Sequence, residues 1–258
     1  MLSLEKIKEF LCEELQNADI NIFDEVTSTN TLLKEQGRSK NEWCTVIASS
    51  QTGGKGRLGR SFYSPENTGV YFSVLLKPDL KIEKAILITT AAAVAVTKAL
   101  EKLGAENPQI KWVNDIFINN KKVCGILTES VINSVSKKLD FAVLGVGVNL
   151  FEPKGSFPED LKSIAGAVFS EEMPDIKERF VAEFLNGFYK LYKNLSTASF
   201  MNEYREKCFI LGKEISVISD ESVRKGIAKA IDENARLEVE FSDNHIEFIS
   251  SGEISIKI

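Results

Sequence analysis

The segment of this chain best equipped for chemistry is SQTGGKGRLGRSF, residues 50–62, which places Lys55, Arg57 and Arg60 among four glycines. Glycine allows positive φ and close backbone approach, so the amides of such a loop can line a concave surface around phosphate oxygens. The ammonium and guanidinium groups would add charge-assisted donors. The pattern is not the Walker loop GxxxxGK[ST]. Taken alone, it fits an anion site, a solvated loop or a contact with nucleic acid.

Three further segments carry polar or glycine-rich patterns: STN at 28–30, KWVNDIFINNKKVCGILTE at 111–129 and GVGVN at 145–149. In isolation, STN predicts a helix N-cap, and the lysine pair within the second segment predicts a solvated turn. The single histidine, His245, falls in the turn-like SDNHIEF, where we expect it at the surface of a hairpin end. With a single histidine, the chain lacks an essential base for most Ser-His-Asp triads and an essential ligand for most zinc sites.

Composition limits the classes of protein to consider. The chain has 258 residues, 43% of them hydrophobic and 27% charged, which is enough for a substantial core and a small second domain. A net charge of −5 argues against a surface built to neutralise a polyanion, so any anion site must be local. Four separated cysteines without a CxxC pair or a secretory segment favour a reducing cytoplasm.

The elements that must position these residues follow from periodicity. We expect helices over 3–16, 29–36 capped by Ser28 or Thr29, 85–100 and 174–195, and strands over 43–49, 70–76 and 141–150. The run at 85–100 is short for a membrane span and contains Lys98, so we interpret it as a buried helix. IKWVNDIFINN predicts a strand that turns at Asn119 and Asn120 into a second strand from Lys121.

The tail after Cys208 consists of short β-type runs separated by Gly, Asp and Asn, the pattern of a small barrel or sandwich. We place a domain boundary near Phe209, which gives a catalytic domain at 1–208 and a barrel at 209–258.

Taken together and in this order, the loop, KWVNDIFINNKKVCGILTE and GVGVN resemble the biotin–protein ligase family, with STN upstream and SGEISIK at 251–257. The resemblance covers essentially the whole chain. It implies an α/β (α+β) fold with a mixed central β-sheet flanked by helices, similar to class II aminoacyl-tRNA synthetases, followed by an SH3-like barrel. It also implies a two-step reaction. Biotin and ATP, with Mg²⁺, give biotinoyl-5′-AMP, and a lysine of a biotin carboxyl carrier protein or domain then displaces AMP.

The resemblance also implies roles for individual residues. Lys122, Arg57 and Lys55 would be catalytic, with Lys122 stabilising the charge between carboxylate and α-phosphate and Lys121 on the opposite strand face. The biotin site would comprise Ser28, Thr29, Asn30, Gln51, Gly54, Lys55, Gly56, Arg57, Lys122 and Gly125, with the first four around the ureido ring. The ATP site would comprise Arg57, Arg60, Lys111, Asn114, Asp115, Lys122 and Asn149, with the two asparagines at the adenine.

One of these interpretations stays open at the level of sequence. Asp115 could order Mg²⁺, contact ribose-phosphate or serve as a structural residue at a strand end, so no metal ligand is assigned. Trp112 is expected in the core.

Four positions depart from the family pattern: Lys55, Phe62, Val113 and Lys257 stand where arginine, tryptophan, proline and arginine are usual. Because lysine lacks the bidentate fork of arginine, we hypothesise that the chain retains the adenylate less tightly than a Lys55→Arg variant would.

Alternative functions are a lipoate–protein ligase-like acyltransferase, which shares the architecture, and a non-catalytic nucleic-acid-binding module. The polar STN and Gln51 set favours a ureido ring over an aliphatic dithiolane, and the acidic net charge counts against nucleic acid. Only some two dozen residues precede STN, too few for a winged helix, so we expect a ligase without operator binding. A homodimer is possible, and both monomers and dimers fit the sequence.

Overall fold

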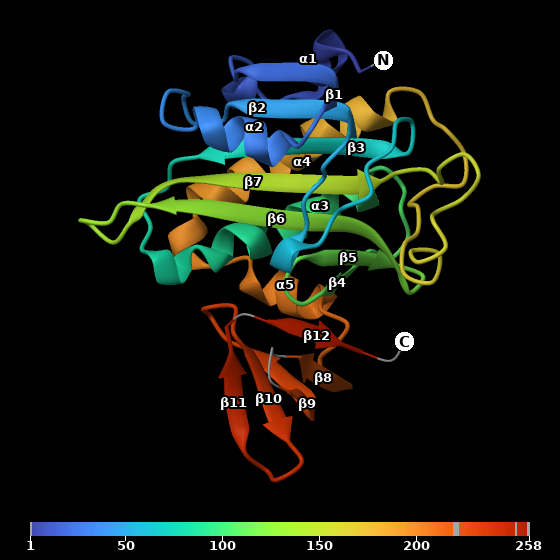
Figure 1. The fold of residues 1–258 in the computed structure, drawn as a ribbon. Helices are drawn as coiled ribbons and strands as arrows, with labels where there is room; N and C mark the ends of the chain where they lie inside the picture. Colours follow the sequence, from blue (N-terminus) through green and yellow to red (C-terminus); the bar gives the residue numbers. More distant parts are fainter. Residues whose placement is uncertain (1, 219–221, 251, 257–258) are drawn as a thin grey trace.

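The computed structural model describes residues 2–218, 222–250 and 252–256, and Lys257 lies outside this range. Its larger domain is built on a seven-stranded sheet in the order β1-β2-β3-β7-β6-β5-β4 (Figure 1). In that order the strands are Ile20–Val26, Thr45–Gln51, Gly69–Leu76, Leu139–Asn149, Lys121–Ile132, Asp115–Ile118 and Gln109–Lys111. The β1 and β2 strands pair in parallel and the other neighbours pair antiparallel, which makes the sheet mixed.

The helices of this domain divide unequally between the two faces of the sheet. They are α1 (Leu4–Phe10), α2 (Thr29–Gln36), α3 (Ile86–Lys102), α4 (Ile176–Lys193) and α5 (Met201–Lys207). Helices α3 and α4 pack together against one face, whereas α2 lies on the opposite face, over β2, β3 and β7 (Figure 1). The α2 face is therefore only partly covered by helix.

Alternation along the central strands explains this division, because successive side chains of a strand point to opposite faces. In β3, Phe72 faces α4 and packs against Phe180 and Phe184 with ring centroids 6.3 and 5.2 Å apart. Leu75, three residues further along the strand, faces the other way and packs with Leu33 of α2 in a smaller apolar cluster. The main core thus lies under α3 and α4, which leaves room on the α2 face for polar groups.

The smaller domain is a five-stranded antiparallel sheet in the order β11-β10-β9-β8-β12. Its strands, β8 to β12, are Glu214–Ile218, Val223–Ile231, Leu237–Phe241, Ile246–Ile249 and Glu253–Ser255. Trp112, buried in the large domain, donates its indole N–H to the Ala235 carbonyl at 2.9 Å and so ties the two domains together. His245 lies in the β10–β11 hairpin turn and is half exposed, as predicted.

The expected fold class is confirmed, but two local predictions were wrong, and strand β1 was missed. The helix predicted over 3–16 ends at Phe10, and a separate 3₁₀ turn follows at Glu13–Leu15. The Cys12 amide leaves the helix to donate to Asn186 of α4 at 2.8 Å, and the Gln16 side chain caps the carbonyls of Lys8 and Leu11. Tertiary hydrogen bonds here outweigh helical periodicity.

The other two differences concern strands. Strand β1 was not predicted; its burial pattern has no strict alternation, and it forms as an edge strand by pairing with β2. The single strand expected before the Asn119–Asn120 turn divides into β4 and β5. The break falls where Trp112 turns inward and Asn114 takes its main-chain bond from Ile126.

Candidate active site

The glycine-rich loop folds into a small hairpin beside the α2 face of the sheet. Its arms are joined by bonds from the Phe62 amide to the Gly54 carbonyl at 2.9 Å and from the Gly56 amide to the Arg60 carbonyl at 2.7 Å. A 3₁₀ turn, Arg57–Gly59, forms its tip. Gly54 is buried, and a Cβ there would overlap the Phe62 carbonyl, so this position requires glycine to close the hairpin.

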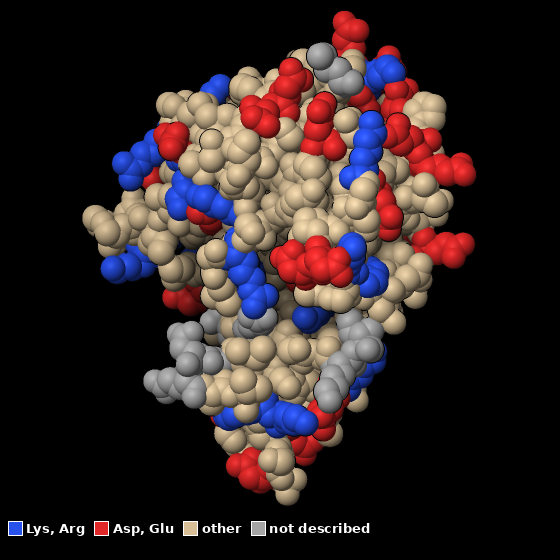
Figure 2. All heavy atoms as spheres, turned by 45° about the vertical axis from the view of Figure 1, so that its right-hand side comes forward, with Lys and Arg blue, Asp and Glu red and all other residues tan. Residues whose placement is uncertain are grey.

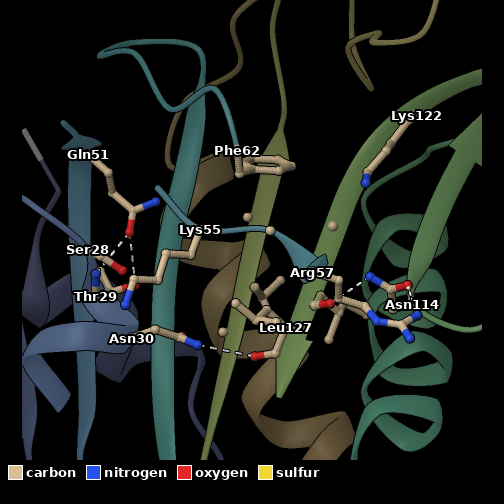
Figure 3. Close-up of a pocket in the computed structure, with 16 residues that line it drawn as sticks. Ser28, Thr29, Asn30, Gln51, Lys55, Arg57, Phe62, Asn114, Lys122 and Leu127 are labelled. Atoms are coloured by element: carbon tan, nitrogen blue, oxygen red, sulfur yellow. Dashed lines mark hydrogen bonds between the residues drawn. The ribbon is translucent and has the colours of Figure 1, made fainter. Parts of the chain in front are cut away.

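A pocket opens between this hairpin, the start of α2 and the strands β6 and β7 (Figure 3). Its floor consists of glycines: Gly125 pairs with Gly147 across the two strands, and Gly145 pairs with Leu127. The Phe62 ring lies over the first pair, at 3.1 Å from a Cβ built on Gly125 and 2.6 Å from one built on Gly147. Without side chains on this floor, the ring and a ligand can approach the backbone of the sheet.

The end of the pocket nearest α2 is a connected set of uncharged polar side chains. The hydroxyl of Ser28 caps α2 by accepting the Thr31 amide at 3.4 Å. The Gln51 side-chain oxygen accepts the Thr29 amide at 2.9 Å, and its Nε2 donates to Ser64 Oγ at 3.0 Å. Figure 3 shows these groups gathered on one side of the pocket. Because every member is held by another, the set is preorganised.

Asn30 completes this set from the first turn of α2. Its Nδ2 donates to the Leu127 carbonyl at 3.4 Å and to Glu129 Oε2 at 3.0 Å, while its Oδ1 accepts the Ser73 hydroxyl at 2.6 Å. A Cβ on Gly145 would overlap that Oδ1 atom, so Gly145 makes the space that Asn30 fills. Asn30 is almost entirely buried.

A second pocket adjoins the first on the side of β4 and β5, and it is rich in charge. It is lined by Arg57, Arg60, Lys111, Asp115 and Lys122, and also by Gly252 and Ile254 of the small domain. Of the described residues that line it, only Asp115 is acidic. The second pocket therefore suits a polyanion better than the first pocket does.

The two pockets share one wall. Five residues line both of them: Gly56, Arg57, Phe62, Asn114 and Lys122. Arg57 donates to Asn114 Oδ1 at 3.1 Å, and Asn114 Nδ2 donates to the Ile126 carbonyl at 2.8 Å. The Lys122 ammonium lies 2.6 Å from Asp115 Oδ1. Two cations are thus held at the boundary between a polar pocket and a charged one.

Lys121, the neighbour of Lys122, points away from the site as expected for adjacent strand positions. Its ammonium donates to the carbonyls of Lys162 and Ser163 at 2.8 and 2.9 Å. The main chain of Lys122 is meanwhile bonded to Ile164 and Gly166. The segment around residue 164 therefore fixes this end of β6 from outside the pockets.

Of the predicted site residues, all but two line one of the pockets. Gly54 closes the loop instead, and Asn149 lies buried at the end of β7, where its Nδ2 donates to the Gly166 carbonyl at 3.3 Å. Lys55 lines the first pocket and Lys111 the second, 5.9 Å from the Phe117 ring centroid. The predicted residues come from four separate segments of the chain, which the sheet brings together.

Sequence reasoning missed several pocket residues, namely Ile126, Leu127, Gly145, Val146 and Gly147, and treated Phe62 only as a departure. A signal existed for the glycines: they stand two apart in an otherwise apolar strand, so both had to lie on one face. The aliphatic residues carry no such signal, because they resemble core residues.

Burial and hydrogen bonds set the ionisation of groups around the site. Burial raises the pKa of Glu129, but bonds from Lys34 and Asn30 outweigh this, and the pKa is lowered overall. Burial also raises the pKa of the Cys124 thiol, which points away from the α2 face toward the main core. Glu129 is thus a carboxylate at neutral pH, and Cys124 is not a nucleophile.

Away from the pockets, the described surface carries charges of both signs. On the face in Figure 2, basic side chains form separate patches between acidic ones rather than a continuous band. Across the described part of the chain, His, Cys, Asp and Glu side chains do not gather in groups of three or more that could hold a metal ion. In the same ranges, every helix is too short or too polar to span a bilayer.

Comparison with known proteins places these features in a family. Residues 22–149 match the biotin/lipoate A/B protein ligase family, and residues 210–257 match the biotin protein ligase C-terminal domain. The chain is 33% identical to the bifunctional ligase/repressor BirA of Bacillus subtilis over 201 residues, which are 77% of this chain and 61% of that relative. It thus spans less than two thirds of that relative's length.

Two other comparisons cover more of the related protein. A biotin–[acetyl-CoA-carboxylase] ligase of Mycobacterium tuberculosis is 25% identical over 234 residues, 88% of this chain and 84% of that one. The structure of a biotin protein ligase from Aquifex aeolicus in complex with biotin and ATP superposes with a TM-score of 0.73 at 26% identity, covering 92% and 97% of the two chains. With both of its domains matched in the same order, the chain belongs to the biotin protein ligase family.

Proposed function

We propose that this protein is an ATP-dependent ligase that forms biotinoyl-5′-AMP and transfers biotin to a lysine of a biotin carboxyl carrier domain. The observation that carries the proposal is the shared wall of the two pockets, where Arg57 and Lys122 face both. Joining a carboxylate to a phosphate brings two anions together, and fixed cations at the meeting point lower the cost of doing so.

The first pocket matches the polar head of biotin. A ureido ring has a carbonyl that accepts hydrogen bonds and two N–H groups that donate them. Gln51 commits one Nε2 proton to Ser64, which leaves the second for the ligand, and the Ser28 hydroxyl can donate while it accepts the cap bond. The open acceptor is Asn30 Oδ1. The polar groups at this end suit such a ring better than the aliphatic dithiolane of lipoate.

The second pocket would take the triphosphate. In the first step a biotin carboxylate oxygen attacks the α-phosphorus, the bond to the bridging oxygen breaks, and pyrophosphate leaves. Lys122 and Arg57 stabilise the charge that builds up on the phosphoryl oxygens, and Asp115 holds the Lys122 ammonium in place. In the second step the acceptor amine attacks the acyl carbon, AMP leaves, and the amine loses a proton.

Magnesium fits this arrangement in its usual mode, with few protein carboxylates and several phosphate or water oxygens. Asp115 is the acidic side chain that the described lining of the second pocket could offer to it. A bound Mg²⁺ would screen the phosphate charge.

The loop hairpin would cover the bound adenylate and keep the mixed anhydride from water. Its Lys55 and Gly56 line the first pocket, and Arg60 at its second arm lines the other.

The direct test is biotin-dependent exchange of labelled pyrophosphate into ATP. We expect exchange with biotin and background exchange with lipoate or without an acid. Exchange with lipoate alone would replace biotin by lipoate as the substrate, and absence of exchange with either acid would refute the adenylation proposal. Incubating the protein with an apo biotin carboxyl carrier domain then tests transfer, read as a mass increase on one acceptor lysine.

The expectation that this chain does not bind operator DNA stays a prediction. A gel shift with biotin, ATP and candidate operator DNA checks it, and a specific complex would contradict it.

A further inference from the structure

Glu129 belongs to β6 and lines a cavity next to the first pocket rather than the first pocket itself. Its two carboxylate oxygens have different partners: Oε2 accepts from Asn30 Nδ2 at 3.0 Å, and Oε1 accepts from Lys34 Nζ at 2.9 Å. The side chain is 20% exposed. Its position on the α2 face follows from the strand, because Leu127 and Glu129 are two residues apart.

The hydrogen bonds of Asn30 allow only one of the two orientations of its side-chain amide. Both Nδ2 protons are committed, one to Glu129 and one to the Leu127 carbonyl, and both of these partners are acceptors. If the amide turned by half a revolution, its oxygen would face a carboxylate and a carbonyl. The Ser73 hydroxyl does not decide the matter, since a hydroxyl can donate or accept.

The oxygen end of Asn30 is the end that meets the pocket. Oδ1 lies directly above the Cα of Gly145, which lines the pocket floor. It accepts one bond from Ser73 and keeps a second lone pair. In Figure 3 the amide nitrogen lies on the side of Leu127, to whose carbonyl it donates.

We propose that Glu129 is a positioning residue that sets ligand specificity: its carboxylate locks the Asn30 amide so that only an acceptor faces the ring of the substrate. The inference rests on the proposed function, because it concerns the ureido ring of biotin. A ring N–H at this point gains a hydrogen bond, whereas a ring oxygen would meet Asn30 Oδ1 with two lone pairs facing each other. A buried acceptor left without a donor disfavours such an analogue strongly.

The test compares biotin with its two cyclic carbamate analogues, in which one or the other ring N–H is replaced by oxygen. Dissociation constants are measured by calorimetry for the wild type, Glu129→Gln and Lys34→Met. Glutamine keeps the size of glutamate, but its amide can donate as well as accept, so only the Leu127 carbonyl still opposes a turn of the Asn30 amide. Lys34→Met removes the ion pair and keeps the carboxylate at Asn30, which makes it the matched control.

We expect the wild type to prefer biotin over one carbamate by at least about 100-fold. In Glu129→Gln the preference should fall about 10-fold or more, chiefly through tighter binding of the carbamate, and in Lys34→Met it should stay within about threefold. A loss of packing alone would weaken both ligands together and leave their ratio unchanged.

An unchanged ratio in Glu129→Gln would overturn the proposal, as would a wild type that binds biotin without distinguishing either carbamate. A wild type that does not bind biotin at all is a different result, since it refutes the proposed function itself. Pyrophosphate exchange by the same preparations separates the two failures.

Discussion

The two pockets are built in different ways, although they share a wall. At its α2 end the first is a chain of neutral side chains, in which Gln51 bonds to Thr29 and Ser73 bonds to both Thr29 and Asn30. The second collects cations from the loop, from β4 and from β6, with Arg57 bonded to Asn114 and Lys122 paired with Asp115. Recognition of shape and polarity needs a fixed set of partners. Attraction of a polyanion needs charge more than exact position.

The largest effect should come from filling the floor of the first pocket. Gly145→Ala places a methyl group on Asn30 Oδ1, and the network must move to accommodate it. We expect biotin affinity to fall by about 100-fold, on the order of 3 kcal/mol, as measured by calorimetry. ATP binding should change little.

The control for this change is Gly187→Ala in the middle of α4. The nearest atom to a Cβ there, on Ala95, is 4.0 Å away. Alanine should stabilise this helix by about 0.5–1 kcal/mol without affecting biotin. If Gly145→Ala bound biotin as well as this control, the first pocket would not be the biotin site.

Removing a cation from the shared wall should mainly raise the KM for ATP. In Arg57→Met the charge and the bond to Asn114 are lost, and we expect the KM for ATP in the exchange assay to rise about 10- to 100-fold. Arg38→Met, which breaks an exposed pair with Asp140, should change it by less than about twofold. Equal effects of the two variants would show that the second pocket does not hold the triphosphate.

A smaller effect is expected from the loop lysine. Lys55→Arg adds a bidentate fork over the first pocket, so biotinoyl-AMP should leave about two- to fivefold more slowly than from the wild type. A trap that consumes free adenylate measures this rate. Equal release rates would show that the side chain at residue 55 does not affect adenylate retention.

The smallest expected effect is a pH-dependent change in the free energy of unfolding when Glu129 is replaced. Because the pKa of Glu129 is lowered in the folded protein, its charge stabilises the fold above the unfolded pKa, and this contribution is lost as pH falls through the folded pKa. Glu129→Gln should therefore cost about 1 kcal/mol at pH 7 and less at pH 3, measured by urea unfolding. A cost that does not shrink at acidic pH would contradict the ionised, hydrogen-bonded carboxylate.

Local signals explain what could be predicted from sequence. Ser28 caps α2, and Asn119 and Asn120 form the predicted turn with positive φ, because each depends on neighbours in the chain. The site residues were predicted from the order of their motifs along the chain, which needs no geometry. Their grouping in two pockets with a common wall could not be predicted, since it depends on the register of β6 against β5 and β7.

What escaped prediction depends on distant partners. Cys12 ends the first helix because Asn186 accepts its amide, and the two lie 174 residues apart in the chain. Strand β1 acquires its structure from β2. The role of Glu129 was equally hidden, because an acidic residue in a polar stretch of strand resembles a solvated one until Asn30 is placed beside it.

The central claim is that the carboxylate and the phosphate meet at the shared wall, and a matched pair of adjacent lysines tests it most directly. Biotin-dependent pyrophosphate exchange should fall at least about 100-fold in Lys122→Met and stay within about threefold in Lys121→Met. Equal exchange in the two variants, with the fold intact, would contradict the claim and place the adenylation chemistry elsewhere.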